Sequence, residues 1–196
     1  MSVHIEPLTG DDAIALLPSL AQLRIDVFRE YPYLYDGDLD YEQKYLHSLA
    51  TSKDAIIVGA YQDDRLVGAS TGAPLITQQE AFQAPFEGRG ISLEEVFYFG
   101  ESVLLPEFRG RGFGHAFFDE REDHARSLQG IRICAFCSVV RPEEHPAKPS
   151  DYRPHDRFWQ KRGYSILEDA VASFPWREVG DAEESEHPMQ FWMRPL

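Results

Sequence analysis

The sequence predicts a mixed α/β protein with one central, mostly antiparallel sheet flanked by helices. Apolar runs of strand length alternate with segments in which apolar residues repeat at helical spacing. Two of the strand-like runs flank the short polar turn 62–65, which is typical of an antiparallel hairpin. The chain has 196 residues and no low-complexity linker or internal repeat, so we expect a single domain over residues 1–196.

The first half of the chain should supply most of the sheet. We expect a strand over Val3–Leu8 and then a helix from Thr9 or Asp11 to about Glu30, because leucines recur there at helical spacing. After a tyrosine-rich and acidic loop, Asp40 and Gln43 resemble a capping box that begins a short helix ending near Leu49. β-prone apolar runs predict strands over 55–61, 66–75 and 94–105, with a helical turn and loop in 77–90.

The second half should alternate helices and strands. Helical spacing predicts a helix over 113–128, and the apolar run 131–140 predicts a strand. Four prolines make 141–154 an irregular loop, and a short helix over 155–162 should end at Gly163, a typical C-cap residue. Short strands are expected at 164–167, 171–175 and 190–194, with an exposed acidic loop over 178–188.

Charge and hydropathy exclude several classes of function. The net charge of −14 argues against nucleic-acid binding and against docking on anionic membranes. No run of about 18 apolar residues exists to span a bilayer. The N-terminal residues lack the basic and apolar regions of a signal peptide, so we expect a cytoplasmic protein.

The two cysteines, Cys134 and Cys137, have the C-x-x-C spacing of redox and metal sites. They lie in an apolar run of strand type, where residues three apart point to opposite faces of the sheet. No second Cys or Cys/His pair completes a zinc site. We therefore expect two buried, reduced thiols and no metal.

The most informative segment is a glycine-rich turn between a strand and a helix. Residues 104–114 read LLPEFRGRGFG, with three glycines and two arginines after Pro106. Glycine lets the backbone approach a ligand closely, and the free N–H groups of a first helical turn bind anions. The spacing matches neither a dinucleotide-binding turn nor a Walker A loop. Taken by itself, the segment is therefore either a structural turn or a site for a different phosphate-bearing cofactor.

The spacing Arg109-x-x-Gly112-x-Gly114 resembles the signature turn of the GNAT superfamily of acyl-CoA-dependent N-acetyltransferases. The segment 157–164, RFWQKRGY, resembles a later element of that family, in which an aromatic pair precedes basic residues and Gly-Tyr or Gly-Phe. The order of the predicted elements also matches. The resemblance implies the GNAT fold and acetyl-CoA as co-substrate.

By this resemblance, backbone N–H groups of the turn hold the diphosphate of acetyl-CoA. The implied residues are Arg109, Gly110, Arg111, Gly112, Phe113 and Gly114, with Phe158 from the later element. The pantetheine arm should lie in a splay between the fourth and fifth strands, beside Val103, Leu104 and Leu105. Backbone groups there can polarise the thioester carbonyl in the manner of an oxyanion hole.

The implied reaction is direct attack of an amine on the thioester, which needs a base for the ammonium proton and an acid for the leaving thiolate. Glu101, on the fourth strand, is the candidate base. Many relatives have Tyr as the second residue of the aromatic pair, whereas this chain has Trp159, which cannot donate a titrating proton. Tyr152, Tyr164 and His155 are alternative acids, or the thiolate takes its proton from water.

In the family, the first two helices and their loop commonly wall the acceptor site. Here Tyr33, Tyr35, Asp36 and Asp38 could cradle a cation by charge pairing and cation–π contact, or else form a solvated surface loop. We therefore expect N-acetylation of a small-molecule amine. The alternatives are a protein or peptide N-acetyltransferase and a non-catalytic acyl-CoA sensor. The substitution at Trp159 favours the sensor. The family also makes a homodimer a reasonable expectation.

Overall fold

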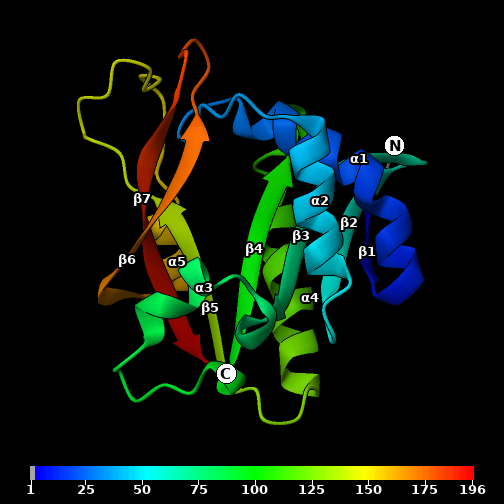
Figure 1. Ribbon diagram of the computed structural model, residues 1–196. Coiled ribbons are helices and arrows are strands. Elements are labelled where there is room, and N and C mark those ends of the chain that lie inside the picture. The colour runs from blue at the N-terminus through cyan, green and yellow to red at the C-terminus, as the bar shows by residue number, and fades with distance from the viewer. Residues whose placement is uncertain (1–2) are drawn as a thin grey trace.

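The computed structural model describes residues 3–196 and has one open sheet of seven strands (Figure 1). The sheet order is β1–β2–β3–β4–β5–β7–β6. The strands are β1 (Val3–Leu8), β2 (Ile56–Gln62), β3 (Arg65–Pro74), β4 (Val96–Leu104), β5 (Ile133–Val139), β6 (Ser165–Arg177) and β7 (Glu184–Pro195). Every neighbouring pair is antiparallel except β4 and β5. The predicted fold class is confirmed.

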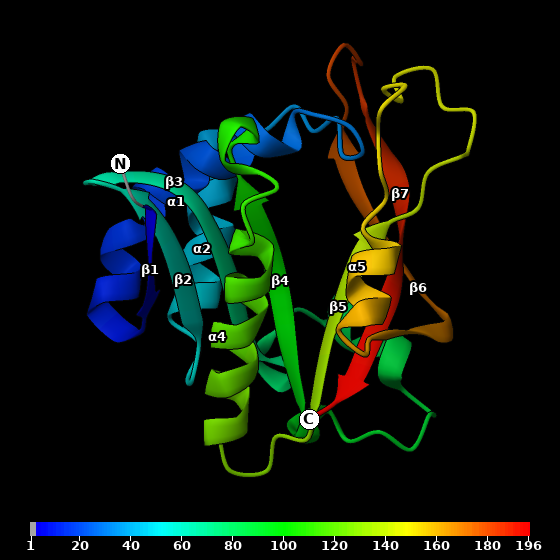
Figure 2. The same cartoon turned by 180° about the vertical axis from the view of Figure 1, so that it is seen from behind.

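Helices cover both faces of the sheet. α1 (Gly10–Phe28) and α2 (Leu39–Ala50) lie on one face, whereas α4 (Phe113–Ser127) and α5 (Asp156–Lys161) lie on the other (Figures 1 and 2). Between β3 and β4 the chain forms α3 (Glu80–Gln83) and three 3₁₀ turns, Leu75–Thr77, Ala84–Phe86 and Leu93–Glu95. A further 3₁₀ turn, Pro106–Phe108, links β4 to the glycine-rich turn.

Two apolar layers hold the helices to the sheet. On the α1/α2 face, Leu20, Leu46, Ile57 and Val103 are fully buried together. On the α4 face the layer is aromatic, with Phe97, Phe99, Phe117, Phe118 and Tyr164 in one cluster. Four charged residues are also buried on the helices that make these layers, namely Arg24, Glu42, Arg121 and Glu122. Because buried charges need partners, these residues are informative about the site.

The predicted start of α2 differs from the structure. The N-cap is Asp38, whose carboxylate accepts a hydrogen bond from the Tyr41 N–H at 2.9 Å, rather than Asp40 in a capping box with Gln43. Either aspartate could have served as the cap. The sequence places two candidate caps within one turn, and the observed cap lies two residues earlier than the predicted one.

The last two strands are longer than the sequence predicts. Segments 164–167 and 171–175 belong to one strand, β6, which is interrupted by a register shift between Ile166 and Val171. The prediction of a loop over 178–188 is wrong for its second half. Glu184–Pro188 belongs to β7 and pairs with Ser173–Arg177 of β6. An acidic, exposed strand at the sheet edge has the composition of a loop, and cross-strand contacts such as Ser173 Oγ to Glu186 (2.6 Å) hold it extended.

The cysteines behave as predicted. Cys134 and Cys137 are free and buried, and they lie in separate apolar clusters on opposite faces of β5. Burial raises the pKa of each thiol to about 12. Neither is therefore a thiolate at neutral pH. No helix of residues 3–196 is both long and apolar enough to cross a bilayer.

Candidate active site

The central sheet opens between its two parallel strands. Pairing of β4 with β5 covers only Val96–Tyr98 opposite Ile133–Ala135, and the strands then diverge (Figure 2). The divergence divides the sheet into a β1–β4 arm and a β5–β7 arm. The splay predicted from the family resemblance is therefore present, and it leaves the second half of β4 without a strand partner on its β5 side.

Hydrogen-bond alternation shows which backbone groups face this opening. The Leu105 N–H donates to the Val67 carbonyl at 2.9 Å, and in an antiparallel pair every second residue makes such bonds. The backbone of Val103 therefore points to β3, whereas those of Ser102 and Leu104 point towards β5. The Leu104 carbonyl accepts from Arg109 Nε at 3.1 Å on that side. Of the predicted strand residues, Leu104 presents its backbone to the opening, and Val103 is buried under α1 and α2.

The glycine-rich turn has the backbone geometry of an anion cradle. Gly110 and Gly112 have φ of +75° and +89°, which side chains other than glycine adopt with strain, and Gly112 is the N-cap of α4. Within residues 3–196, the N–H groups of 110–114 have no hydrogen-bond acceptor; the first bond of α4 runs from His115 to the Gly112 carbonyl. The exposed helix N-terminus is therefore available to a diphosphate.

The two arginines of the turn have different surroundings. Arg109 pairs with Glu30, which follows α1, at 2.8 Å, in addition to its bond to Leu104, so it fastens the turn to β4 and to the segment after α1. Arg111 is exposed, and its guanidinium lies 5.4 Å from the ring centre of Phe108. In the part of the chain that the structure describes, no carboxylate lies within 4.0 Å of Arg111. Arg111 is therefore the more available cation for a phosphate.

Aromatic rings form the opposite wall, on the β5–β7 arm. The Phe158 ring would lie 3.6 Å from a Cβ at Gly114, so α5 packs directly against the start of α4. The Trp159 ring packs at a tilt against Phe136 and edge to face against Trp192, with ring centres 5.0 and 5.1 Å away. Trp159 therefore lines the opening, and its side chain has no hydroxyl that could donate a proton.

Glu101 reaches its position through a β-bulge. Pairing of β3 with β4 steps from Ser70–Ser102 to Gly72–Phe99, so Gly100 and Glu101 together oppose Thr71. A Cβ at Gly100 would lie 2.5 Å from Thr71 Oγ1, which only glycine avoids. Because Phe97 and Phe99 face α4, Glu101 would also face α4 without the extra residue. The bulge instead turns Glu101 to the α1/α2 face.

On that face Glu101 belongs to a buried charge cluster. Arg24 of α1 donates to Glu42 of α2 through Nε and to Glu101 through Nη1, and it lies over the rings of Phe28 and Tyr45. The Oε1 atoms of Glu42 and Glu101 are buried and have no hydrogen-bond partner among residues 3–196. Two carboxylates thus share one guanidinium. Burial raises the pKa of Glu101, although Arg24 opposes the shift.

The predicted acceptor aspartates have partners within the protein. Asp36 pairs with Arg29 at 3.1 Å and with Arg177 of β6 at 2.7 Å, and Asp38 caps α2. The Tyr33 ring packs between Phe28 and Trp176. The backbone of Tyr35 forms an isolated antiparallel β-bridge with that of Glu178. The loop therefore connects the two arms rather than projecting as a solvated segment, as its path from α1 to β6 shows in Figure 1.

Arg141, at the end of β5, reinforces this connection. Its guanidinium donates to the carbonyls of Pro32 (2.6 Å) and Tyr33 (2.8 Å) and pairs with Glu178 at 2.5 Å. The Val179 N–H donates to the Leu34 carbonyl at 2.7 Å. We call residues 31–38 the strap, because this segment crosses from one arm to the other above the opening.

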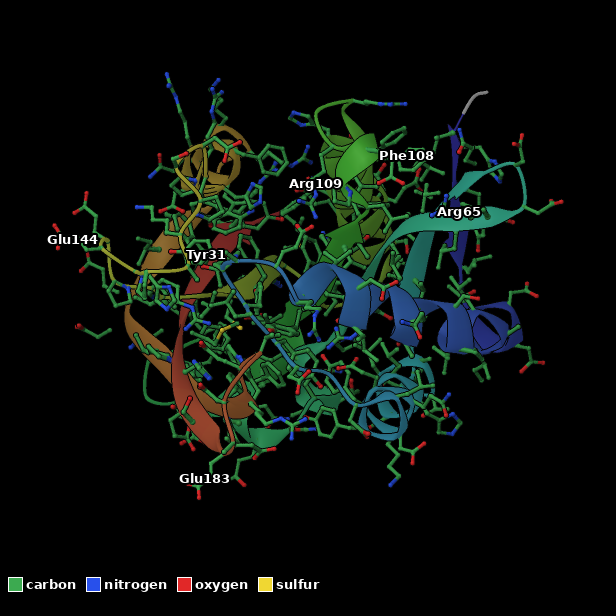
Figure 3. The ribbon with its side chains drawn as sticks, turned by 90° about the horizontal axis from the view of Figure 1, so that it is seen from above. Tyr31, Arg65, Phe108, Arg109, Glu144 and Glu183 are labelled. Atoms are coloured by element: carbon green, nitrogen blue, oxygen red, sulfur yellow. The ribbon has the colours of Figure 1, made fainter. Side chains whose placement is uncertain are left out.

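The candidate acids lie in different places. Tyr152, in the proline-rich loop, meets Tyr31 of the strap edge to face, with ring centres 4.7 Å apart. Tyr31 is labelled in Figure 3. The Tyr164 hydroxyl is buried on the far side of β5 and donates to Glu122 at 3.0 Å. His155 precedes α5, with its ring 5.8 Å from that of Trp159. Of the three side chains, Tyr152 and His155 lie on the loop and helix that border the opening.

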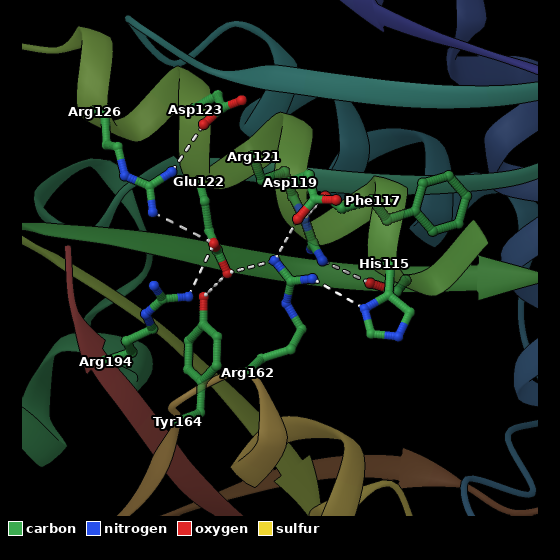
Figure 4. A network of polar contacts seen from close by, with 11 residues as sticks. His115, Phe117, Asp119, Arg121, Glu122, Asp123, Arg126, Arg162, Tyr164 and Arg194 are labelled. Atoms are coloured by element: carbon green, nitrogen blue, oxygen red, sulfur yellow. Dashed lines mark hydrogen bonds and ion pairs between the residues drawn. The ribbon is translucent and has the colours of Figure 1, made fainter. Parts of the chain in front are cut away.

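A second buried network joins the two arms behind the site. The Glu122 carboxylate of α4 contacts Arg162 after α5, Arg194 of β7 and the Tyr164 hydroxyl, each at 3.0–3.1 Å (Figure 4). Because α4 belongs to one arm and α5 and β7 to the other, this network fixes the angle between them. Tyr164 therefore has a structural partner that the sequence did not indicate.

The splay, the glycine turn at a helix N-terminus and the bulged fourth strand together define an acyl-CoA-binding α/β fold. A family model, described as the acetyltransferase (GNAT) family, matches residues 18–164, and the chain belongs to this family. Membership makes it an acetyltransferase with acetyl-CoA as its co-substrate. Within residues 3–196, no group of three or more His, Cys, Asp or Glu side chains is arranged to hold a metal ion.

Solved structures share the fold at low sequence identity. The ribosomal-protein-alanine N-acetyltransferase from Brucella melitensis is 15% identical, with a TM-score of 0.63, covering 98% of this chain and 99% of that one. Arabidopsis thaliana NAA60 in complex with acetyl-CoA is 12% identical, with a TM-score of 0.63 and coverage of 100% and 99%. The putative acetyltransferase yncA from Salmonella typhimurium with acetyl-CoA is 12% identical, with a TM-score of 0.61 and coverage of 98% and 94%. Comparison with curated protein sequences gives no match.

The sequence did not point to Arg24, Glu42 or Arg121. A signal was nevertheless present, because each lies in the apolar stripe of its helix. Arg24 follows Leu20 and precedes Phe28 at intervals of four, Glu42 precedes Leu46, and Arg121 follows Phe117. A charged residue at a buried position of an amphipathic helix needs a partner inside the protein.

Proposed function

We propose that this protein transfers an acetyl group from acetyl-CoA to the primary amine of a small-molecule acceptor by direct attack on the thioester. The observation that carries the proposal is the bulge, which places the Glu101 carboxylate on the α1/α2 face at the strand that borders the splay. Glu101 serves as the base, and its raised pKa brings it closer to the operating pH.

The buried cluster supports a cationic acceptor. Glu42 and Glu101 carry two negative formal charges against the one positive charge of Arg24, and each has an oxygen with no hydrogen-bond partner among residues 3–196. An ammonium group is the chemistry that such an excess attracts. We therefore assign acceptor binding to this cluster rather than to Asp36 and Asp38. Asp36 pairs with Arg177, and Asp38 caps α2.

The strap supports a small acceptor rather than a folded protein. It is fixed at both ends, by Arg109–Glu30 beside α1 and by Arg141 and Val179 at the β6 side, so it limits the opening above the splay. The thioester supplies an activated acyl group. Ser102 and Leu104 direct backbone groups towards its expected position, where an N–H can stabilise the developing oxyanion.

Proton delivery to the leaving thiolate is assigned to Tyr152. Burial raises the pKa of its hydroxyl, which therefore keeps its proton at neutral pH. Its position beside the strap also favours it over Tyr164, whose hydroxyl donates to Glu122. Tyr152→Phe should lower kcat, and Tyr164→Phe serves as the matched control. Equal kcat values in the two variants would leave water as the proton source.

The test is thiol release from acetyl-CoA with phenethylamine, spermidine, Nα-acetyl-lysine and a peptide with a free N-terminal alanine. We expect turnover of a small amine, and a loss of about 10²–10⁴-fold in kcat/KM for Glu101→Gln. The acidic limb of the pH profile should disappear in that variant, while calorimetry gives unchanged acetyl-CoA affinity. Glu107→Gln, an exposed carboxylate near the turn, is the matched control.

The alternatives predict different results in the same assay. Turnover of the peptide alone would indicate a protein or peptide N-acetyltransferase, an activity that the name of the Brucella melitensis neighbour states for that protein. Acetyl-CoA binding without thiol release on any amine would indicate a sensor, which the wall position of Trp159 favours. Full activity of Glu101→Gln would refute the assignment of the base.

A further inference from the structure

Arg121 of α4 is a buried arginine without an acidic partner. Its residue is 1% exposed, and no carboxylate of residues 3–196 lies within the 4.0 Å of a salt bridge. The guanidinium carbon lies 4.2 Å from the ring centre of Phe99 and 5.0 Å from that of Phe118. Burying an arginine in this way is costly, so its hydrogen bonds must compensate.

The hydrogen bonds of Arg121 converge on the bulge of β4. Nη1 donates to the carbonyls of Thr71 and Glu101, at 3.1 Å each, and Nη2 donates to Ser102 Oγ at 2.9 Å. Nε donates to the Phe117 carbonyl of its own helix at 3.0 Å. Thr71 and Glu101 are the residues that face each other where the extra residue interrupts the ladder.

This pattern answers the physical problem that a bulge creates. The inserted residue prevents regular pairing, and buried carbonyls must find other donors. Arg121 supplies two N–H bonds to them from one planar group, and a third to the side chain of the next residue. A single ammonium group lacks this fork geometry, so lysine cannot reproduce it.

We propose that Arg121 is a positioning residue that holds the β4 bulge and thereby fixes both the Glu101 carboxylate and the backbone of Ser102. The proposal rests on the proposed function, in which Glu101 is the base. Arg121 touches neither the expected acceptor nor the carboxylate itself; it acts from the opposite face of the sheet, through the peptide unit of Glu101.

Arg121 also contributes charge. Burial lowers the pKa of Arg121 to about 10, so the guanidinium remains protonated at neutral pH. The groups that act on Glu101 come from every neighbouring element: Arg24 of α1, Glu42 of α2, Thr71 of β3 and Arg121 of α4. Arg24, Thr71 and Arg121 oppose the effect of burial and lower the pKa of the carboxyl, whereas Glu42 raises it.

The experiment compares Arg121→Lys with Arg121→Met. The Glu101 carboxyl is titrated by ¹³C NMR with labelled glutamate, and its resonance is assigned by its absence in Glu101→Gln. Arg121→Met should raise the midpoint by about one pH unit because a positive charge is lost. Arg121→Lys should leave the midpoint near the wild-type value but lower kcat about tenfold on the most active panel amine, because the fork is lost.

Controls separate positioning from general stability. Arg132→Met removes an exposed arginine between α4 and β5, which pairs with Glu95, and should change neither the midpoint nor kcat. Relative to Glu101→Gln, the double variant Arg121→Lys/Glu101→Gln should lose less activity than Arg121→Lys loses relative to wild type, because the part of the effect that acts through Glu101 is already absent. If Arg121→Met does not fold, Arg121→Lys decides the question by itself.

Two results would overturn the proposal: wild-type kcat in Arg121→Lys, or an unchanged Glu101 midpoint in folded Arg121→Met. Failure of the proposed function has a different signature, since Glu101→Gln would then retain full activity whatever Arg121 does. The NMR titration requires no acceptor. It therefore tests the coupling between Arg121 and Glu101 even if none of the panel amines is a substrate.

Discussion

Removing Arg24 should destabilise the protein strongly and in a pH-dependent manner. Arg24, Glu42 and Glu101 carry a formal charge of −1 together, and their side chains are 11%, 0% and 2% exposed. Arg24→Met leaves a charge of −2 in the same volume. Breaking a buried pair by removing one partner costs about 3–5 kcal/mol. Because natural domains are stable by roughly 5–15 kcal/mol, the free energy of unfolding should fall by a large fraction.

The sign of the pH dependence follows from the carboxyl groups. Without Arg24, the pKa of Glu101 in the folded protein rises further above its unfolded value, because Arg24 is the group that opposes the effect of burial most strongly. A carboxyl whose folded pKa is raised favours the folded state at low pH, and this contribution is lost as pH rises through the folded pKa. The penalty of Arg24→Met should therefore be smaller at pH 5 than at pH 7.5, by about 1.4 kcal/mol for each unit of pKa change that titrates in this window.

Urea unfolding followed by circular dichroism at pH 5 and pH 7.5 measures both effects. With a slope of about 3 kcal/mol per molar urea, the upper end for domains, the midpoint at pH 7.5 should fall by about 1–1.7 M. Glu42→Gln is the matched control: it leaves one carboxylate for one guanidinium and should change stability by about 1 kcal/mol or less. An equal loss at both pH values would refute the electrostatic reasoning, because lost packing does not depend on pH.

Two further predictions concern the glycine turn and the thiols. Gly112→Ala and Gly130→Ala each place a side chain at positive φ, +89° and +92°, at a cost of about 1–2 kcal/mol of stability. Only Gly112→Ala should also weaken acetyl-CoA binding, by tenfold or more in calorimetry. Equal acetyl-CoA affinities of the two variants would contradict the role of the turn. With thiol pKa values of about 12 against an ordinary value of 9.0, Cys134 and Cys137 should not react with an aromatic disulfide reagent at pH 8 unless guanidinium is added. Their contribution to stability is complete below pH 9 and is lost as pH rises to about 12, so rapid reaction of the native protein at pH 8 would show that one thiol is accessible.

Local signals in the sequence were sufficient for the order of elements and the cofactor turn. The helix over 113–127 and the strand before it follow from periodicity, and the glycines between them have the positive φ that only glycine adopts easily. These features depend on residues close together in the chain. Strands β6 and β7 were predicted less well because their acidic residues are held extended by cross-strand pairing, which a local pattern does not contain.

The environment of Glu101 could not be predicted because alternation in β4 is broken by one residue. Counting by twos from Phe97 and Phe99 places Glu101 under α4, whereas the structure places it beside Arg24 on the other face. Nothing local in the segment 96–104 marks the bulge except Gly100, and a lone glycine in a strand has several explanations. The evidence for the bulge lies elsewhere in the sequence: a buried carboxylate requires a cation on its own face, and displaced carbonyls require donors on the other. Arg24 and Arg121 sit in the apolar stripes of α1 and α4 and meet these two needs from opposite sides of one peptide unit. A charged residue in the buried stripe of a helix is therefore the signal to follow when a strand residue of the active site must be assigned to a face.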